Sequence, residues 1–181
     1  MKTVKGFSLV ELITVIAIIG IMAAVAIVSL VPAKTSTKLN AAGQELMATV
    51  KLAQSYAFQG KVVKDNGVNV VPCGFGIYTG AGDAEKYEIF YIFSNDCFAL
   101  NQEPLNFNNA KSLEEYTLKN GVIFDAGSTG KRIYFTVPHG VIFGNDGNIL
   151  SDIMDIVLES NDKIKNIQIK PGGVIEEGVV Q

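Results

Sequence analysis

The chain opens with a nearly unbroken apolar run. Between Phe7 and Val31 the only charged residue is Glu11, and apolar side chains fall on every face of a helical wheel. With a rise of about 1.5 Å per residue, a helix over this run would be roughly 37 Å long, enough to cross the ~30 Å hydrocarbon layer of a bilayer. A helix that is apolar all round is surrounded by lipid or by similar helices. We therefore predict a transmembrane helix over residues 7–31.

Two other interpretations of the apolar run fit less well. A buried helix of a soluble protein is the first alternative, and the length and uniformly apolar character of this run argue against it. A secretory signal peptide has an apolar core of about 7–15 residues followed by a small-residue cleavage site, whereas this run is longer and no such site follows. Lys2 and Lys5 precede the run while Lys34 and Lys38 follow it, so positive charge alone does not settle orientation. The short basic head fits a cytoplasmic N-terminus, with the polar remainder outside.

The residues after Pro32 continue with a helical period. A proline removes one backbone hydrogen bond and usually kinks, rather than ends, a helix that is supported by packing. Gly60 favours a helix end. We predict an amphipathic continuation over residues 32–60 that lays its apolar stripe on a globular domain. The stripe consists of Leu39, Ala42, Leu46, Val50, Ala53 and Ala57.

From about residue 62 the pattern changes to short strands and turns. Residues 145–148 and 171–173 are strong turn signals, and residues 101–120 are expected to be a surface excursion without an assigned element. Short strands beside one helix predict an α+β fold, with the helix packed on an antiparallel sheet in a head over residues 61–181. The predicted strands are 68–71, 74–79, 87–93, 122–124, 132–137, 154–159 and 164–170. Alternation is clear for Ile133, Phe135 and Val137 and for Met154, Ile156 and Leu158.

Composition and charge narrow the function. The length of 181 residues suits one modest domain plus an extra element. Lys and Arg number 15 against 18 Asp and Glu, without a basic block, which argues against nucleic acid as the main partner. No Ser or Cys has a plausible base, and no phosphate-binding loop is evident. We expect no enzymatic activity, no cofactor and no metal site.

Two short motifs have plain structural interpretations. Asn145-Asp146-Gly147-Asn148 is similar to calcium loops, but Ile142 and Gly144 stand where an EF-hand would require ligands. A tight turn is therefore favoured. His139, between a proline and a glycine, is interpreted as a turn residue without a catalytic role.

Cys73 and Cys97 both fall in the predicted head. Outside the cytoplasm oxidation is permitted, and an even number of cysteines there favours a bridge. Closing this loop would stabilise the head by roughly 3 kcal/mol on the chain-entropy model. The alternative is two buried free thiols. A metal site built from these cysteines and His139 would lack a fourth ligand.

Glu11 requires a separate explanation. An ionised carboxylate at the centre of a membrane helix costs about 2.5–3.5 kcal/mol, so such residues usually have a partner and a function. If the chain were cut between Gly6 and Phe7, the new α-amino group would supply a cation. Phe7 and Glu11 are one helical turn apart, so the pairing could be internal. It could equally join the amine of one chain to Glu11 of a neighbour.

The segment Gly6-Phe7-Ser8-Leu9-Val10-Glu11-Leu12, followed by the apolar helix, resembles the class III leader of type IV prepilins and type II secretion pseudopilins over residues 5 to about 30. The resemblance implies a pilin-like fold and a leader over residues 1–6. It implies that a prepilin peptidase cuts after Gly6 and methylates the amine of Phe7. It also implies that Glu11 pairs with the N-terminus of a neighbouring subunit during filament assembly.

The same resemblance implies a location and partners. The subunit would span the inner membrane once, with its head outside, and would then enter a pilus or pseudopilus filament. Partners would be prepilin peptidase, the inner-membrane assembly platform, membrane lipid before assembly, and like or related pilin subunits.

The C-terminal half loosely resembles the GspH/FimT-type minor pseudopilins, in Gly121–Phe124 and Ile133–Gly140 and in a final strand before Gly172. The alternative function is therefore that of a minor tip pilin that binds DNA, a surface or a secreted substrate. Some such proteins bind DNA through a basic C-terminal segment. Here Val174–Gly178 is acidic, so DNA binding is not expected.

Overall fold

The computed structural model describes residues 8–100, 104–137 and 140–180, with side chains over 8–25, 34–98, 104–137 and 140–178. The N-terminal helix α1 spans Leu9–Gln59, so the predicted continuation through Pro32 is confirmed. The chain divides within α1 into two units, residues 1–37 and 38–181, which are described separately below. Among the described residues, no helix combines the length and hydropathy of a membrane span.

In the second unit, α1 carries the predicted apolar stripe. All six stripe residues are buried, from 0% exposure at Leu46 to 6% at Ala42. The helix ends at Gln59, and Gly60 follows with a φ of +60°, the left-handed conformation that closes many helices. The Gly60 amide donates to Ala57 O and the Lys61 amide donates to Tyr56 O. The amphipathic helix and its glycine end are therefore both confirmed.

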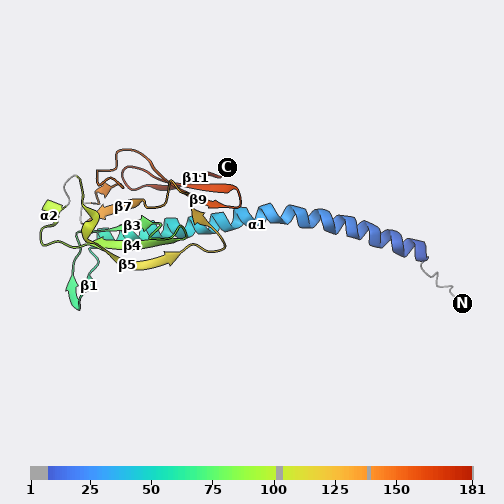
Figure 1. Cartoon of the computed structure of the whole chain (residues 1–181), viewed down its shortest axis with the longest axis horizontal. Coiled ribbons are helices and arrows are strands. Elements are labelled where there is room, and N and C mark those ends of the chain that lie inside the picture. The colour runs from blue at the N-terminus through green and yellow to red at the C-terminus, as the bar shows by residue number, and fades with distance from the viewer. Residues whose placement is uncertain (1–7, 101–103, 138–139, 181) are drawn as a thin grey trace. The chain divides into compact units, whose positions relative to one another are not determined.

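Strands from two antiparallel sheets pack on this helix (Figure 1). The five-stranded sheet has the order β5-β4-β3-β7-β8, and the four-stranded sheet has the order β11-β10-β9-β6. A separate hairpin is formed by β1 and β2. The strands are β1 Val63–Asp65, β2 Val68–Val70, β3 Gly74–Thr79, β4 Lys86–Ile92, β5 Ala110–Thr117, β6 Ile123–Phe124, β7 Arg132–Thr136, β8 Ile142–Phe143, β9 Met154–Ser160, β10 Lys163–Ile169 and β11 Ile175–Val180; α2 spans Cys97–Leu100 and a 3-10 turn spans Phe107–Asn109.

The main core lies between the apolar stripe of α1 and both sheets. Ile167 of β10 and Phe75 of β3 are fully buried in it, and the rings of Tyr56 and Phe75 meet edge-on at 5.7 Å. A Cβ at Gly76 would overlap the Phe90 ring, so glycine is needed where β3 and β4 pack. These contacts confirm the predicted α+β fold. A second cluster uses the opposite face of the five-stranded sheet: Phe90, Ile92, Leu105, Tyr134 and Phe143.

Four of the strands in the structure were not predicted. Within residues 101–120, Ala110–Thr117 forms the edge strand β5, because an edge strand with polar side chains does not show the apolar pattern of a buried strand. Strands β1, β8 and β11 were also missed. The apolar/polar alternation of β9 is confirmed, since Ile156 and Leu158 are buried. Strand β7 is buried on both faces: Ile133, Phe135 and Val137 share the face toward the main core, as predicted, and Tyr134 faces the second cluster.

Candidate functional site: the apolar segment of α1

The first unit presents an apolar cylinder. Its described large apolar side chains are exposed, at 73% for Leu9, 61% for Ile16 and 67% for Val25. Such a surface is far larger than the isolated apolar residues found on ordinary soluble proteins, and it marks a segment that contacts lipid or other apolar helices. Gly20 has open space around it, with nothing within 4 Å of an added Cβ. The segment can therefore approach another helix closely there.

Glu11 is placed in the first turn of α1. The amides of Glu11 and Leu12 donate to Ser8 O at 3.1 and 3.2 Å, and Thr14 Oγ1 donates to Glu11 O at 2.9 Å. A carboxylate in the first turn is favoured by the partial positive charge of a helix N-terminus. Gly6 and Phe7 lie outside the described residues. The cleavage site, the methylation site and the assembly role of Glu11 therefore stay predictions.

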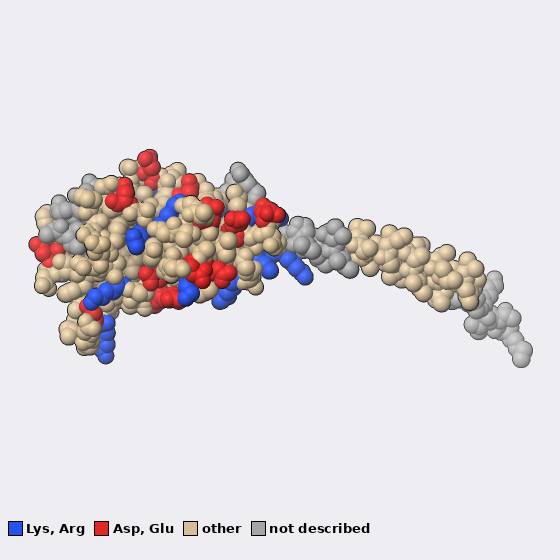
Figure 2. All heavy atoms as spheres, in the orientation of Figure 1, with Lys and Arg blue, Asp and Glu red and all other residues tan. Residues whose placement is uncertain are grey.

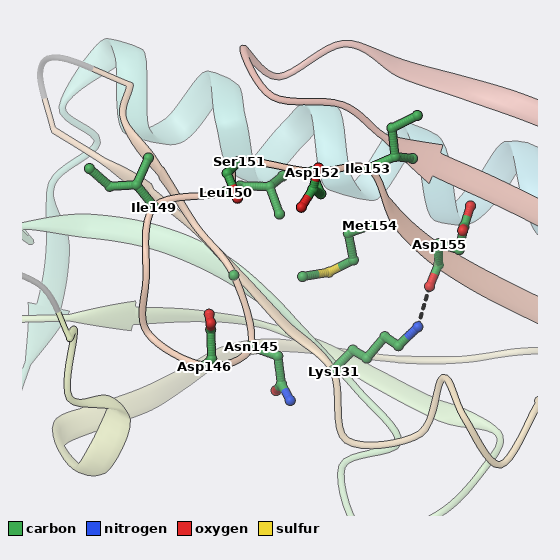
Figure 3. A pocket seen from close by; sticks show the side chains of 11 residues that line it. Lys131, Asn145, Asp146, Ile149, Leu150, Ser151, Asp152, Ile153, Met154 and Asp155 are labelled. Atoms are coloured by element: carbon green, nitrogen blue, oxygen red, sulfur yellow. Dashed lines mark hydrogen bonds between the residues drawn. The ribbon is translucent and has the colours of Figure 1, made fainter.

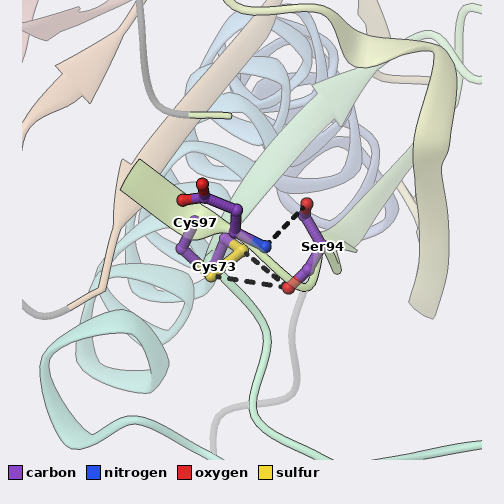
Figure 4. Close-up of a disulfide and its surroundings, with 4 residues drawn as sticks. Cys73, Ser94 and Cys97 are labelled. Atoms are coloured by element: carbon purple, nitrogen blue, oxygen red, sulfur yellow. Dashed lines mark hydrogen bonds between the residues drawn. A yellow bond between two sulfur atoms is a disulfide. The ribbon is translucent and has the colours of Figure 1, made fainter. Parts of the chain in front are cut away.

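The predicted disulfide is present. Cys73 precedes β3 and Cys97 begins α2, with their Cα atoms 5.1 Å apart, and the described residues contain no free cysteine. Both sulfur atoms lie near the Ser94 carbonyl oxygen, at 3.7 and 3.8 Å (Figure 4). The amide of Cys73 donates to Ile92 O at 2.8 Å. The bridge therefore fastens the segment after β4 to the start of β3.

Residues 144–148 form the predicted tight turn. Gly144 N donates to Asn148 O at 2.8 Å, and Gly147 has a φ of +79°. The Asp146 carboxylate accepts hydrogen bonds from the side chain and the amide of Asn148, at 2.7 and 3.1 Å. These bonds lower the pKa of Asp146, the side-chain bond most. His139, the other residue assigned to a turn, lies outside the described residues.

A hollow of about 460 Å³ lies between this turn and the start of β9 (Figure 3). Lys131 reaches across it and donates to the backbone oxygen of Asp155. The carboxylate of Asp155 is occupied by the sheet, because Oδ1 accepts from Asn166 at 2.9 Å and from Gln168 at 3.0 Å. Ser151 lines the hollow, but the lining residues include no histidine that could activate it.

A buried lysine was not predicted from the sequence. Lys165 of β10 is 1% exposed, and its ammonium lies 2.9 Å from Asn40 Oδ1 and 3.1 Å from Glu177 Oε2. The lysine stem passes over Gly43, where an added Cβ would meet Lys165 Cε at 2.7 Å. The cluster thus joins α1, β10 and β11. The only signal in the sequence is the alternation of β10: Lys165 lies two residues before Ile167 and four before Ile169, so all three share the core-facing side of the strand.

A second polar cluster ties the end of α1 to β5. Glu114 accepts from the Tyr116 hydroxyl at 2.6 Å and from the Tyr56 hydroxyl at 3.4 Å, and Lys61 Nζ lies 3.5 Å away. The Tyr116 hydroxyl is the main cause that lowers the pKa of Glu114; burial opposes it, and the Lys61 ammonium assists. Lys61 also lies 3.3 Å above the centre of the Tyr56 ring.

Comparison with known families supports the interpretation of the N-terminal segment. Residues 1–27 match a family model described as the prokaryotic N-terminal methylation motif. The match supports a class III leader and a precursor of the type IV pilin and pseudopilin class. This motif implies processing by prepilin peptidase and assembly with other pilin subunits, and it suggests a structural subunit rather than an enzyme. No characterised protein and no solved structure matches the chain significantly.

Proposed function

We propose that the chain is a structural subunit of a type IV pilus or a type II secretion pseudopilus. In this proposal the precursor is cut after Gly6 and methylated at the amine of Phe7. The observation that carries it is the apolar cylinder of α1, with one carboxylate in its first turn, inside the segment that matches the methylation motif. Such a helix has no polar face to turn toward water while it packs on a single soluble core, so its partners would be lipid and other copies of the helix.

The proposed mechanism has two stages. Residues 7–31 first hold the subunit in the inner membrane, with the head over residues 61–181 outside. The assembly platform then moves the helix from lipid into a bundle of like helices. Because both environments are apolar, this transfer gains little hydrophobic energy. The pairing of Glu11 with the amine of a neighbouring Phe7 would supply the stabilisation and select the register, since an unpaired carboxylate in an apolar bundle is costly.

The alternative of a minor tip pilin is less well supported for DNA binding. On the face of the head seen in Figure 2, basic and acidic residues are interspersed. The acidic residues of β11 also have partners in the fold, because Glu176 pairs with Lys170 and Glu177 with Lys165. A duplex would require clustered Lys and Arg.

Intact-mass measurement of the chain isolated from membranes tests the proposal. We expect Gly6→Ala to retain residues 1–6, because the added methyl group would obstruct the peptidase. The matched control is Gly20→Ala, whose added Cβ meets nothing within 4 Å and which should be processed normally. Normal processing of Gly6→Ala would refute the leader assignment.

A further inference from the structure

The hairpin of β1 and β2 presents one unpaired positive charge among exposed apolar side chains. Lys64 of β1 lies opposite Asn69 of β2, and both are exposed. Val62 and Val71, which directly flank the two strands, are 53% and 50% exposed. Lys64 has no ion-pair partner in the part of the chain that the structure describes. Its ammonium is therefore available to a partner outside the hairpin.

The hairpin is fixed beside one outer strand of the five-stranded sheet. Asp65 of β1 pairs with Lys111 of β5, and Val63 of β1 is buried in the main core. Strand β5 is the first strand in the order β5-β4-β3-β7-β8. Figure 1 shows the hairpin projecting from the head. The ion pair and the buried valine thus hold a projection at the β5 side of the sheet.

The hollow beside the tight turn lies at the other side of the same sheet. Gly144 lines this hollow and follows directly after β8, the last strand in that order. With neighbouring strands about 4.8 Å apart, β5 and β8 are separated by roughly 19 Å. The hairpin and the hollow are therefore at opposite edges of one sheet and do not meet within one chain.

The hollow has the opposite charge to the hairpin. Its lining contains the carboxylates of Asp146, Asp152 and Asp155 and one ammonium, that of Lys131. The Asp155 carboxylate and the Lys131 ammonium already have partners in the fold. Asp146 and Asp152 border the open space in Figure 3, and neither has an ion-pair partner among the described residues. Two carboxylates are therefore available to a cation.

Apolar side chains complete the lining of the hollow. Ile149 and Ile153 are each 49% exposed, and Met154 is partly buried beside them. The volume of about 460 Å³ is in the range of protein sites that hold a ligand. A lysine side chain has an aliphatic stem and a charged end. A hollow with apolar walls and carboxylates matches both parts of such a side chain.

We propose that the hairpin of one copy of the chain docks at the hollow of the next copy. The stem of Lys64 lies along Ile149 and Ile153, and its ammonium lies between Asp146 and Asp152. This inference rests on the proposed function, because it requires like subunits beside one another in a filament. It assigns to that filament a contact between heads, in addition to the contact between helices.

A second copy is the occupant that this arrangement favours. Two different and complementary surfaces on one molecule form a heterologous contact, which continues from copy to copy instead of closing on itself. A filament of like subunits needs a contact of this kind. The hairpin does not suit a contact with itself, because Lys64 would then approach a second Lys64, and like charges across an interface are unfavourable.

Photo-crosslinking in sheared filaments of the full chain tests the contact. A photo-reactive side chain at position 69 lies opposite Lys64 and leaves the lysine in place. We expect mass spectrometry to find it joined to residues 144–155 of a second copy. The matched control is position 161, because Asn161 is also an exposed asparagine, in the turn between β9 and β10. Crosslinking from position 161 should not give this product.

Charge reversal tests the pairing of Lys64 with the hollow. Lys64→Glu should lower the crosslink yield from position 69 by about tenfold or more, because it places like charges together. Asp152→Lys alone should have the same effect, and the two changes in one chain should raise the yield again. Both side chains are exposed, so the melting temperature of the head should not change in either variant.

The outcomes separate this contact from the proposed function. A crosslink from position 69 to residues 144–155 that falls in both single variants and returns in the double variant supports the contact. A crosslink to another part of the second copy or to a different protein overturns it, as does an absent crosslink or one that ignores charge. In each of these cases normal cleavage after Gly6 would leave the proposed function intact. A chain that is not cut after Gly6, or that enters no filament, would contradict both.

Discussion

The two halves of α1 share one helical backbone but differ in the exposure of their apolar side chains. In residues 9–25 apolar side chains are exposed all round, whereas in residues 38–59 the stripe from Leu39 to Ala57 is covered by the head and Phe58 stays exposed. The second half therefore has its partners within the chain. The first half has no such partners among the described residues of its unit. The apolar content of a helix thus shows that it is kept from water. The presence or absence of a polar face shows whether it packs on its own domain or contacts lipid or other helices.

The largest difference between the halves is expected in stability. Leu46→Ala should cost about 2–5 kcal/mol, because Leu46 is 0% exposed and its removal leaves a cavity. At about 2–4 °C per kcal/mol, the melting temperature of the head should fall by about 4–20 °C. Ile16→Ala, at a site 61% exposed, is the matched control and should leave it unchanged. Circular dichroism of the full chain in detergent measures both. Equal shifts would contradict the distinction between the halves.

The second largest effect concerns assembly. Glu11→Ala should reduce incorporation into filaments about a hundredfold, because the neighbouring amine would be left as an unpaired charge in an apolar bundle, at a cost of about 2.5–3.5 kcal/mol. Glu45→Ala removes an exposed carboxylate from the packed half and should assemble normally. Quantitative immunoblotting of sheared filaments, with membrane-inserted subunit as the reference, measures the ratio. Normal filaments from Glu11→Ala would count against the pairing.

A smaller effect on the free energy of unfolding is expected from the ion pair between Lys165 and Glu177, which lies beside the packed half of α1. Glu177→Ala leaves the Lys165 ammonium buried without its carboxylate and should cost about 1–3 kcal/mol. Lys165→Met keeps a long side chain over Gly43 without a charge, and it should stay within about 1 kcal/mol of the unmodified chain. Denaturant unfolding of the full chain compares the two variants. Equal losses of unfolding free energy in the two variants would show that the unpaired buried charge is not the cause of the loss in Glu177→Ala.

The smallest effect is expected from pH. The pKa of Glu114 is lowered in the folded state, so its contribution is present above the unfolded pKa and is lost as the pH falls through the folded pKa. Because the Glu114 and Lys61 side chains are about one-third exposed, the effect should stay below about 1 kcal/mol. Glu114→Gln should be slightly less stable near neutral pH, and the gap should close in acid. Melting temperatures recorded from about pH 7 to about pH 3 test this. A constant gap would be inconsistent with the titration of Glu114.

Local patterns predicted the parts of the fold that rest on local physics. The stripe from Leu39 to Ala57 follows the helical period, and Gly60 supplies the left-handed residue that ends the helix. The alternation of β9, the glycine turn before it and the glycine turn after β10 are equally local. The disulfide followed from the proposed compartment and an even count of cysteines.

The missed features depend on distant partners. Strand β5 is polar because it is an edge, and a sequence pattern does not show where a sheet ends. Lys165 occupies a core position whose compensation comes from Asn40 and Glu177, on two other elements. Nothing in the residues next to Lys165 indicates those partners. The proposed partner of Glu11 belongs to another molecule, so one chain does not contain the contact.

The long sequence separation between α1 and β10 has a consequence for biosynthesis. Asn40 and Lys165 are 125 residues apart, so ribosomes adding about 5–20 residues per second need about 6–25 s between them. Throughout that interval β10 and β11 are not yet complete, so the part of the stripe that packs on them stays uncovered. In the proposed function, membrane insertion of residues 7–31 therefore begins before the packed half of α1 is fully covered.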